Sequence, residues 1–208
     1  MPLFPGQPLD LDQLARAFTP RTRAIVVNTP ANPSGRVLTR AELEAIAALC
    51  QRHDAWAVTD EIYEHIRYQG EHIPLATLPG MLERTITISG ASKTFSITGW
   101  RIGTIVSPPS ITEAIRKVHD FLTVGAPAPL QEALATVMDT FPRSFYEEMG
   151  GEYRARRDLL FPALCQAGFR CTAPDGAYYI LADFSGLSDL PDTEFALWLA
   201  KERRVAPV

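Results

Sequence analysis

Two short apolar runs near the start of the chain lack the alternation of a half-buried strand. They cover residues 24–28 and 55–59 and are rich in Ala, Ile and Val. A continuous run of this kind is typical of a strand that is buried on both faces in a parallel sheet. Between them, Thr39 and Glu42 form a capping box at the start of a helical pattern. The order strand, turn, helix, strand predicts a βαβ unit with parallel strands.

The next two apolar runs predict a third and a fourth strand, at residues 85–88 and 102–107. The link between them is too short for a crossover helix, so we expect this pair to be antiparallel. The segment 64–80, ahead of the third strand, is expected to be a polar loop. A short amphipathic helix is expected at residues 11–18, before the first strand.

Helical periodicity dominates the chain after residue 108. Ser110 and Glu113 predict the capped start of one helix, and Pro129 predicts the start of the next. The long, charged segment 143–166 predicts a third helix, of the kind that often connects two domains. A small α+β region is expected to follow, with strands at 169–172 and 178–184 and a helix at 193–203.

Composition narrows the class of protein. The chain has 208 residues, 46% of them hydrophobic and 21% charged, and a formal net charge of −4. There is no cluster of Lys and Arg, so nucleic acid and anionic membranes are poor partners. No apolar run reaches the roughly 18 residues that would span a bilayer. The N-terminal residues lack signal-peptide character, and Cys50, Cys165 and Cys171 fit no metal-ligand spacing. These features favour a reducing, cytoplasmic location.

The residues that could carry chemistry follow the predicted strands. Ligands of α/β sheets bind beyond the carboxyl ends of the strands, and this rule gathers five polar residues in one crevice. Each alone has an ordinary structural interpretation, as a turn residue, a helix cap, a packing residue, a solvated lysine or a surface ion pair. The five residues are Asn32, Asp60, Tyr63, Lys93 and Arg101.

Together these side chains match the needs of pyridoxal phosphate (PLP). That cofactor requires a lysine for a Schiff base and a carboxylate that keeps its ring nitrogen protonated. It also needs donors to its phenolic oxygen and cationic and hydroxyl contacts to its phosphate. The sequence therefore predicts a PLP site with Lys93 at its centre.

The motifs around these residues resemble the class I/II aminotransferases, which are fold type I PLP-dependent enzymes. Three further stretches, at 78–85, 128–133 and 174–179, are most similar to the aspartate/kynurenine/methionine aminotransferase branch. The motifs that carry the family resemblance, in chain order, are Asn32–Gly35, Asp60–Tyr63, Ser92–Lys93 and Gly99–Gly103.

The resemblance implies a role for each candidate residue. Lys93 would form the Schiff base with PLP and, once released, would act as the base that moves the substrate's proton. Asp60 would pair with the ring nitrogen. Tyr63 and Asn32 would hydrogen-bond the phenolic oxygen of the cofactor.

The phosphate contacts include one departure from the family pattern. Arg101 would bind the phosphate, with Ser92 as a hydroxyl contact. The family often has a phosphate-binding Ser or Thr three residues before the lysine, where this chain has Gly90. Either Ser89 or Ser92 is then a candidate to replace it.

The resemblance also implies a fold and its division. We expect an α/β fold that forms part of the fold type I large domain, a mainly parallel sheet with flanking helices, followed by part of a small α+β domain. The expected divisions are 1–142 for the large-domain part, 143–166 for a bridging helix and 167–208 for the small domain. We also expect the chain to lack both an N-terminal half and a C-terminal end of the family, and full-length relatives to be homodimers.

Three functions stay open on the sequence. The first is transamination between an amino acid and a 2-oxo acid. The second is a PLP-dependent C–S β-lyase reaction on the same fold, since the motifs bind the cofactor without choosing the bond that breaks. The third is an inactive remnant that keeps the motifs by descent. The sequence does not indicate the amino donor.

Overall fold

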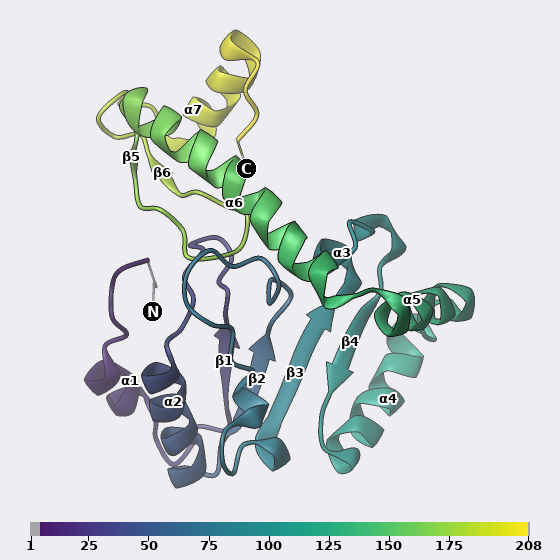
Figure 1. The fold of residues 1–208 in the computed structure, drawn as a ribbon. Helices are drawn as coiled ribbons and strands as arrows, with labels where there is room; N and C mark the ends of the chain where they lie inside the picture. Colours follow the sequence, from purple (N-terminus) through teal and green to yellow (C-terminus); the bar gives the residue numbers. More distant parts are fainter. Residues whose placement is uncertain (1–4, 208) are drawn as a thin grey trace.

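The computed structural model describes residues 5–207. Residues 1–4, which belong to the stretch without signal-peptide character, and residue 208 lie outside this part. A four-stranded sheet with the order β1-β2-β3-β4 occupies one end of the molecule (Figure 1). Its first three strands are parallel and β4 is antiparallel to β3, which confirms the prediction. The strands are β1 Ala24–Asn28, β2 Trp56–Asp60, β3 Thr85–Gly90 and β4 Gly103–Val106.

Helices α1 (Leu11–Ala17) and α2 (Arg40–Arg52) lie beside β1 and β2 (Figure 1). The predicted capping box is present, because the Thr39 hydroxyl accepts from the Glu42 backbone N–H and the Glu42 carboxylate accepts from the Thr39 backbone N–H. The same carboxylate lies 2.6 Å from the guanidinium of Arg36, and both side chains are buried. This cap and ion pair fix the start of the helix that covers the sheet.

The main core joins these helices to one face of the sheet. Its residues include Val27, Leu43, Ile46 and Ala57, all of them buried. The prediction that β1 is buried on both faces is wrong, because Val26, which points away from this core, is 75% exposed. Successive side chains of a strand point to opposite faces, and within residues 5–207 only one face of β1 is covered.

The segment 64–80, between β2 and β3, is not the polar loop that we expected. It holds five buried apolar or aromatic residues and the 3-10 turn Leu75–Thr77. A second 3-10 turn, Leu82–Arg84, leads into β3. Charged residues placed between apolar ones obscured this pattern in the sequence. The five buried residues are Ile66, Tyr68, Ile73, Leu75 and Leu78.

Two helices follow β4, α4 (Pro109–Thr123) and α5 (Ala128–Thr140). Ser110 is not the cap of α4, because the helix starts one residue earlier, at Pro109. Pro108 is the N-cap and makes no side-chain hydrogen bond. A proline suits the first helical position, since its fixed φ is already helical and it has no N–H to satisfy.

The long helix α6 (Arg143–Gln166) runs from the sheet to a small region that contains β5, β6 and α7 (Figure 1). The predicted long strand at 178–184 is wrong, because only Ala182–Asp183 pairs with β5, Arg170–Cys171. Helix α7 (Asp192–Trp198) continues into the π-helical segment Leu199–Arg203. Within residues 5–207, no helix is both long and apolar enough to cross a membrane.

Candidate functional site

Lys93 lies at the carboxyl end of β3, as the sequence predicted. Strand β3 leads directly into the short helix α3 (Ala91–Thr94), which carries the lysine. The backbone N–H of Ala91 donates to the carbonyl of Ile102, 3.2 Å away, and so ties the start of α3 to the segment before β4. The Lys93 amine lies 5.3 Å from the centre of the Tyr178 ring. A half-buried amine over an aromatic face is held in place by a cation–π contact.

Tyr63 contacts the same aromatic ring. It is 2% exposed, and its ring is nearly perpendicular to that of Tyr178, with 5.2 Å between the ring centres. Its hydroxyl lies 3.0 Å from the hydroxyl of Tyr179. Lys93 and Tyr63, two residues of the predicted set, therefore converge on a pair of tyrosines from the far end of the chain.

The pKa values of Tyr63 and Tyr178 are shifted in opposite directions. Burial, together with hydrogen bonding to Tyr179 and Tyr178, raises the pKa of Tyr63 well above that of an ordinary tyrosine. Burial also acts to raise the pKa of Tyr178, but hydrogen bonding with Lys93 and Tyr63 outweighs it and lowers that pKa. Tyr63 therefore keeps its proton at neutral pH and remains available as a hydrogen-bond donor.

Asp60 is the last residue of β2 and lies at the same edge of the sheet. It pairs in register with Asn28 of β1 and with Ile88 of β3. Its carboxylate accepts from the backbone N–H of Ile62 at 3.3 Å. The side chain of Asn28 donates to the Asp60 carbonyl at 3.2 Å and accepts from the N–H of Asn32 at 2.6 Å. Asn28 therefore links the turn that carries Asn32 to the end of β2.

Arg101 and Asn32 are the exposed members of the predicted set. Arg101 has a left-handed backbone, with φ 56°, and its guanidinium donates to the Thr98 carbonyl at 3.1 Å. The hydroxyl of Thr98 donates to the carbonyl of Ser92 at 3.1 Å. Arg101 and Ser92 are thus both linked to Thr98, beside α3. Among the described residues, neither Arg101 nor Asn32 has a hydrogen bond to Lys93.

The two candidate serines differ in what their side chains contact. The Ser89 hydroxyl donates to the carboxylate of Glu64, 2.8 Å away. The Ser92 side chain is half-buried on α3, next to Lys93. This difference favours Ser92 as the hydroxyl contact for a ligand.

Sequence reasoning did not place Tyr178 and Tyr179 in the site. They follow the turn Pro174–Ala177, which packs against the turn after β1. The Gly176 N–H donates to the Gly35 carbonyl at 2.7 Å, and the Ala177 N–H donates to the Ile66 carbonyl at 2.8 Å. The turn formers at 174–176 were a visible signal of a bend, but their partners lie more than 100 residues away in the chain.

Two glycines make this close approach possible. A Cβ at Gly35 would lie 2.4 Å from the Cβ of Pro174, and a Cβ at Gly176 would lie 2.8 Å from the carbonyl oxygen of Ile66. Gly35 also has φ +71°, a conformation that glycine adopts without strain. Neither position can hold a side chain without moving the backbone.

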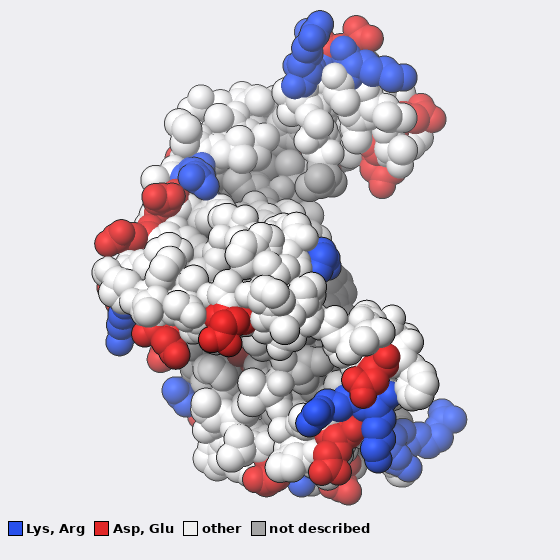
Figure 2. Space-filling model, turned by 90° about the vertical axis from the view of Figure 1, so that its right-hand side faces the viewer, with Lys and Arg blue, Asp and Glu red and all other residues white. Residues whose placement is uncertain are grey.

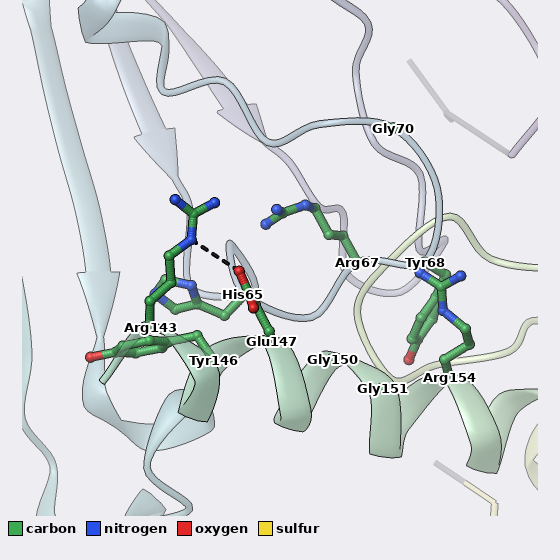
Figure 3. Close-up of a pocket in the computed structure, with 10 residues that line it drawn as sticks. All are labelled: His65, Arg67, Tyr68, Gly70, Arg143, Tyr146, Glu147, Gly150, Gly151 and Arg154. Atoms are coloured by element: carbon green, nitrogen blue, oxygen red, sulfur yellow. Dashed lines mark hydrogen bonds and ion pairs between the residues drawn. The ribbon is translucent and has the colours of Figure 1, made fainter. Parts of the chain in front are cut away.

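A cavity of about 620 Å³ lies away from the strand ends, between the first half of α6 and the segment 65–70 (Figure 3). Arg67 and Arg154 line it, and an ion pair between Arg143 and Glu147, 3.0 Å apart, crosses one end. It contains none of the predicted site residues. A smaller cavity, of about 250 Å³, adjoins Tyr178 and Tyr179. Position at the strand ends, rather than cavity size, identifies the candidate site.

Comparison with known proteins identifies the family of the chain. The sequence model of the family described as "Aminotransferase class I and II" matches residues 2–206, almost the whole chain. The chain belongs to this aminotransferase family. The fold of this aminotransferase chain is thus an α/β fold that corresponds to part of a fold type I aminotransferase.

Similar proteins of known function are transaminases. The aminotransferase chain is 38% identical to mouse kynurenine–oxoglutarate transaminase 1 over 96% of its own length and 51% of that protein. It is 40% identical to N-succinyldiaminopimelate aminotransferase of Mycobacterium tuberculosis, with a TM-score of 0.92 over 99% of its length and 54% of that chain. It is 36% identical to Escherichia coli YbdL, described as having a methionine aminotransferase function, with a TM-score of 0.90, again over 99% and 54%. The aminotransferase chain thus spans about half the length of the relatives that it matches.

Proposed function

We propose that this chain carries the lysine-bearing half of a PLP-dependent aminotransferase that exchanges the amino group of an amino acid with a 2-oxo acid. The observation that supports this most directly is the convergence of Lys93 and Tyr63 on Tyr178, next to the strand end that carries Asp60. The family membership supports aminotransferase chemistry. The domain division 1–142, 143–166 and 167–208 and a homodimeric full-length enzyme are parts of the same proposal.

The donor set of the site suits PLP. It offers an amine, a carboxylate and a protonated phenol at neighbouring strand ends, with an amide and a guanidinium on the adjoining turns. These groups match the carbonyl carbon, ring nitrogen, phenolic oxygen and phosphate of the cofactor. We assign the carbonyl carbon to Lys93, the ring nitrogen to Asp60, the phenolic oxygen to Tyr63 and Asn32, and the phosphate to Arg101 and Ser92.

The mechanism assigns each side chain a separate task. Bound PLP supplies an electron-withdrawing ring that stabilises negative charge at the substrate's α-carbon. Lys93, as a free amine, takes the proton from that α-carbon. Tyr178, whose ring centre lies 5.3 Å from the amine, helps to hold the amine in position. Asp60 holds a proton at the ring nitrogen, and Tyr63 donates a hydrogen bond at the phenolic oxygen.

The chain has three lysines, Lys93, Lys117 and Lys201, which makes a covalent test simple. The chain is mixed with PLP, reduced with borohydride, digested and mapped by mass spectrometry. We expect the adduct on Lys93. Lys117 and Lys201 lie on exposed stretches of α4 and of the segment after α7, and they serve as internal controls for non-specific labelling.

Lys93→Arg keeps the positive charge but cannot form the adduct, so we expect labelling to fall to the level of the two control lysines. Equal labelling of all three lysines in the unmodified chain would refute a specific site. Labelling of Lys93 tests the cofactor site alone and leaves the choice of reaction to a second assay.

The second assay separates transamination from C–S cleavage. Kynurenine and methionine, named in the relatives' descriptions, are offered as amino donors with a 2-oxo acid, and the new amino acid is measured. A cysteine conjugate is offered alone, and pyruvate release is measured. Pyruvate without amino transfer would favour the β-lyase alternative. Labelled Lys93 with neither product would favour a binding remnant.

A further inference from the structure

We infer that Tyr179 is a positioning residue for the proposed reaction, because its hydroxyl holds Tyr63 and directs the Tyr63 proton toward the phenolic oxygen of the bound cofactor. This inference rests on the proposed function. The contacts that support it are made by the segment 174–179, more than 100 residues away from Tyr63 in the chain.

The hydroxyl pair joins the buried Tyr63 to the half-buried Tyr179. The Tyr63 and Tyr179 oxygens are 3.0 Å apart, and the two ring centres are 5.9 Å apart with the planes nearly perpendicular. Tyr63 is 2% exposed. A buried hydroxyl is normally hydrogen-bonded, because leaving it unpaired costs free energy. Tyr179 supplies that partner for Tyr63.

The backbone determines where Tyr179 lies. Besides the bonds from Gly176 and Ala177, the hydroxyl of Tyr68 donates to the Ala177 carbonyl at 2.5 Å, and the Tyr68 N–H donates to the Asp175 carbonyl at 2.6 Å. The turn is therefore bound to the segment that follows Tyr63 in the sequence. This attachment gives Tyr179 little freedom relative to Tyr63.

The chemistry of two phenols sets the direction of the bond. Each hydroxyl has one proton, so either oxygen can be the donor when nothing else is bound. An anionic oxygen next to Tyr63 is the stronger acceptor, because charge-assisted hydrogen bonds are roughly twice as strong as neutral ones. Tyr63 then donates to that oxygen, and Tyr179 donates to Tyr63. The two bonds polarise and strengthen each other.

Other titratable groups surround this pair and must be held constant in a test. Tyr178 contacts both rings, Lys93 contacts Tyr178, and Asp60 lies three residues before Tyr63. Tyr153 of α6 stacks on Tyr178, with 5.7 Å between the ring centres. Tyr153 adds a nearby phenol outside the hydroxyl pair and so provides a matched control.

The test measures the pH midpoint at which the absorbance band of PLP bound to the chain changes, with Tyr179→Phe, Tyr63→Phe and the double variant. A donor to the phenolic oxygen stabilises its negative charge and lowers this midpoint. We expect Tyr63→Phe to raise it by about 1 unit. Tyr179→Phe should raise it by about 0.1 to 0.3 unit, as loss of a polarising partner predicts. In the Tyr63→Phe background, Tyr179→Phe should have no further effect.

Tyr153→Phe should leave the midpoint unchanged. Equal shifts from Tyr179→Phe with and without the Tyr63 hydroxyl would overturn the inference, because the effect would not pass through Tyr63. An unchanged midpoint in Tyr179→Phe would overturn it as well and leave the proposed function intact. If the unmodified chain shows no band of bound cofactor, the proposed function fails and the inference fails with it.

Discussion

The two faces of the four-stranded sheet differ in how far residues 5–207 cover them. On one face, Val27 and Thr59 are 5% and 1% exposed and lie in or beside the core that α2 completes. On the other face, Val26 is 75% exposed and Ile105 of β4 is 47% exposed. The strands nevertheless carry apolar side chains on both faces. Their composition is therefore suited to burial on two sides. Within the described residues one side has its cover at β1 and β2, whereas β4 is exposed on both faces.

Helix α4 belongs to the open part of the molecule. Its residues Phe121 and Leu122 are 95% and 74% exposed. Figure 2, which views the molecule from the side of α4 and α5, shows areas without charged side chains between a mixed group of positive and negative side chains in the lower part and another group at the top. An apolar pattern in the sequence thus marks a surface suited to burial without showing what covers it.

The covered side should respond most strongly to the loss of its buried ion pair. Glu42→Gln leaves the Arg36 guanidinium buried without its carboxylate partner, and we expect a loss of about 3 to 5 kcal/mol in the free energy of unfolding. Gln also keeps only one acceptor oxygen, so the Leu9 N–H and the Thr39 N–H, which bond to the two different carboxylate oxygens, cannot both keep their acceptor. Urea unfolding followed by circular dichroism measures the loss. An unchanged midpoint would show that the ion pair does not hold this region together.

The pH dependence of stability is a second measure of the Arg36–Glu42 ion pair. Burial acts to raise the pKa of Glu42, but hydrogen bonds from Arg36 and the Thr39 backbone outweigh it and lower the pKa to about 2. A carboxyl with a lowered pKa adds stability above its ordinary pKa, near 4.5, and loses it as the pH falls toward 2. We therefore expect Glu42→Gln to flatten the fall in stability between these two values.

A matched pair of leucines compares the two sides directly. Leu43 is 1% exposed on α2 and Leu122 is 74% exposed on α4. We expect Leu43→Ala to cost about 2 to 4 kcal/mol, because it leaves a cavity in the core. Leu122→Ala should change stability by less than about 0.5 kcal/mol. Both are measured by urea unfolding. Comparable losses would mean that α4 is packed in solution, in conflict with the comparison of faces.

The smallest effect on stability is expected at Phe121, the most exposed aromatic residue within residues 5–207. Phe121→Ser should change the free energy of unfolding by less than about 0.5 kcal/mol. It should nevertheless reduce the binding of an apolar fluorescent dye, because it removes a large apolar side chain from an open surface. Dye fluorescence at fixed protein concentration measures this. His119→Ser, on the same helix, is a control that should leave dye binding unchanged.

Local signals predicted much of the fold. Thr39 and Glu42 marked a helix start correctly because both partners of a capping box lie within one turn of chain. The motifs of Asp60, Tyr63 and Lys93 placed these residues at strand ends for a similar reason, since each follows its strand directly. The antiparallel β4 followed from the short link before it.

Long-range contacts were harder to predict. Tyr178 and Tyr179 were assigned to a strand, but their partner Tyr63 lies 116 residues from Tyr179, and no local pattern encodes that distance. The exposure of Val26 has another cause. The composition of a strand indicates that both of its faces are suited to burial. Whether the second face is buried depends on other segments that pack against it.

The contact between Gly35 and Gly176 also has a consequence for how this protein tolerates change. In a saturation scan of single substitutions, the two positions would reject side chains for different reasons, Gly35 by its backbone conformation and by Pro174, and Gly176 by the carbonyl of Ile66. A compensating second mutation could not rescue either one, because backbone atoms occupy the space. Such a scan would then find that two positions far apart in the chain, Gly35 and Gly176, both accept only glycine.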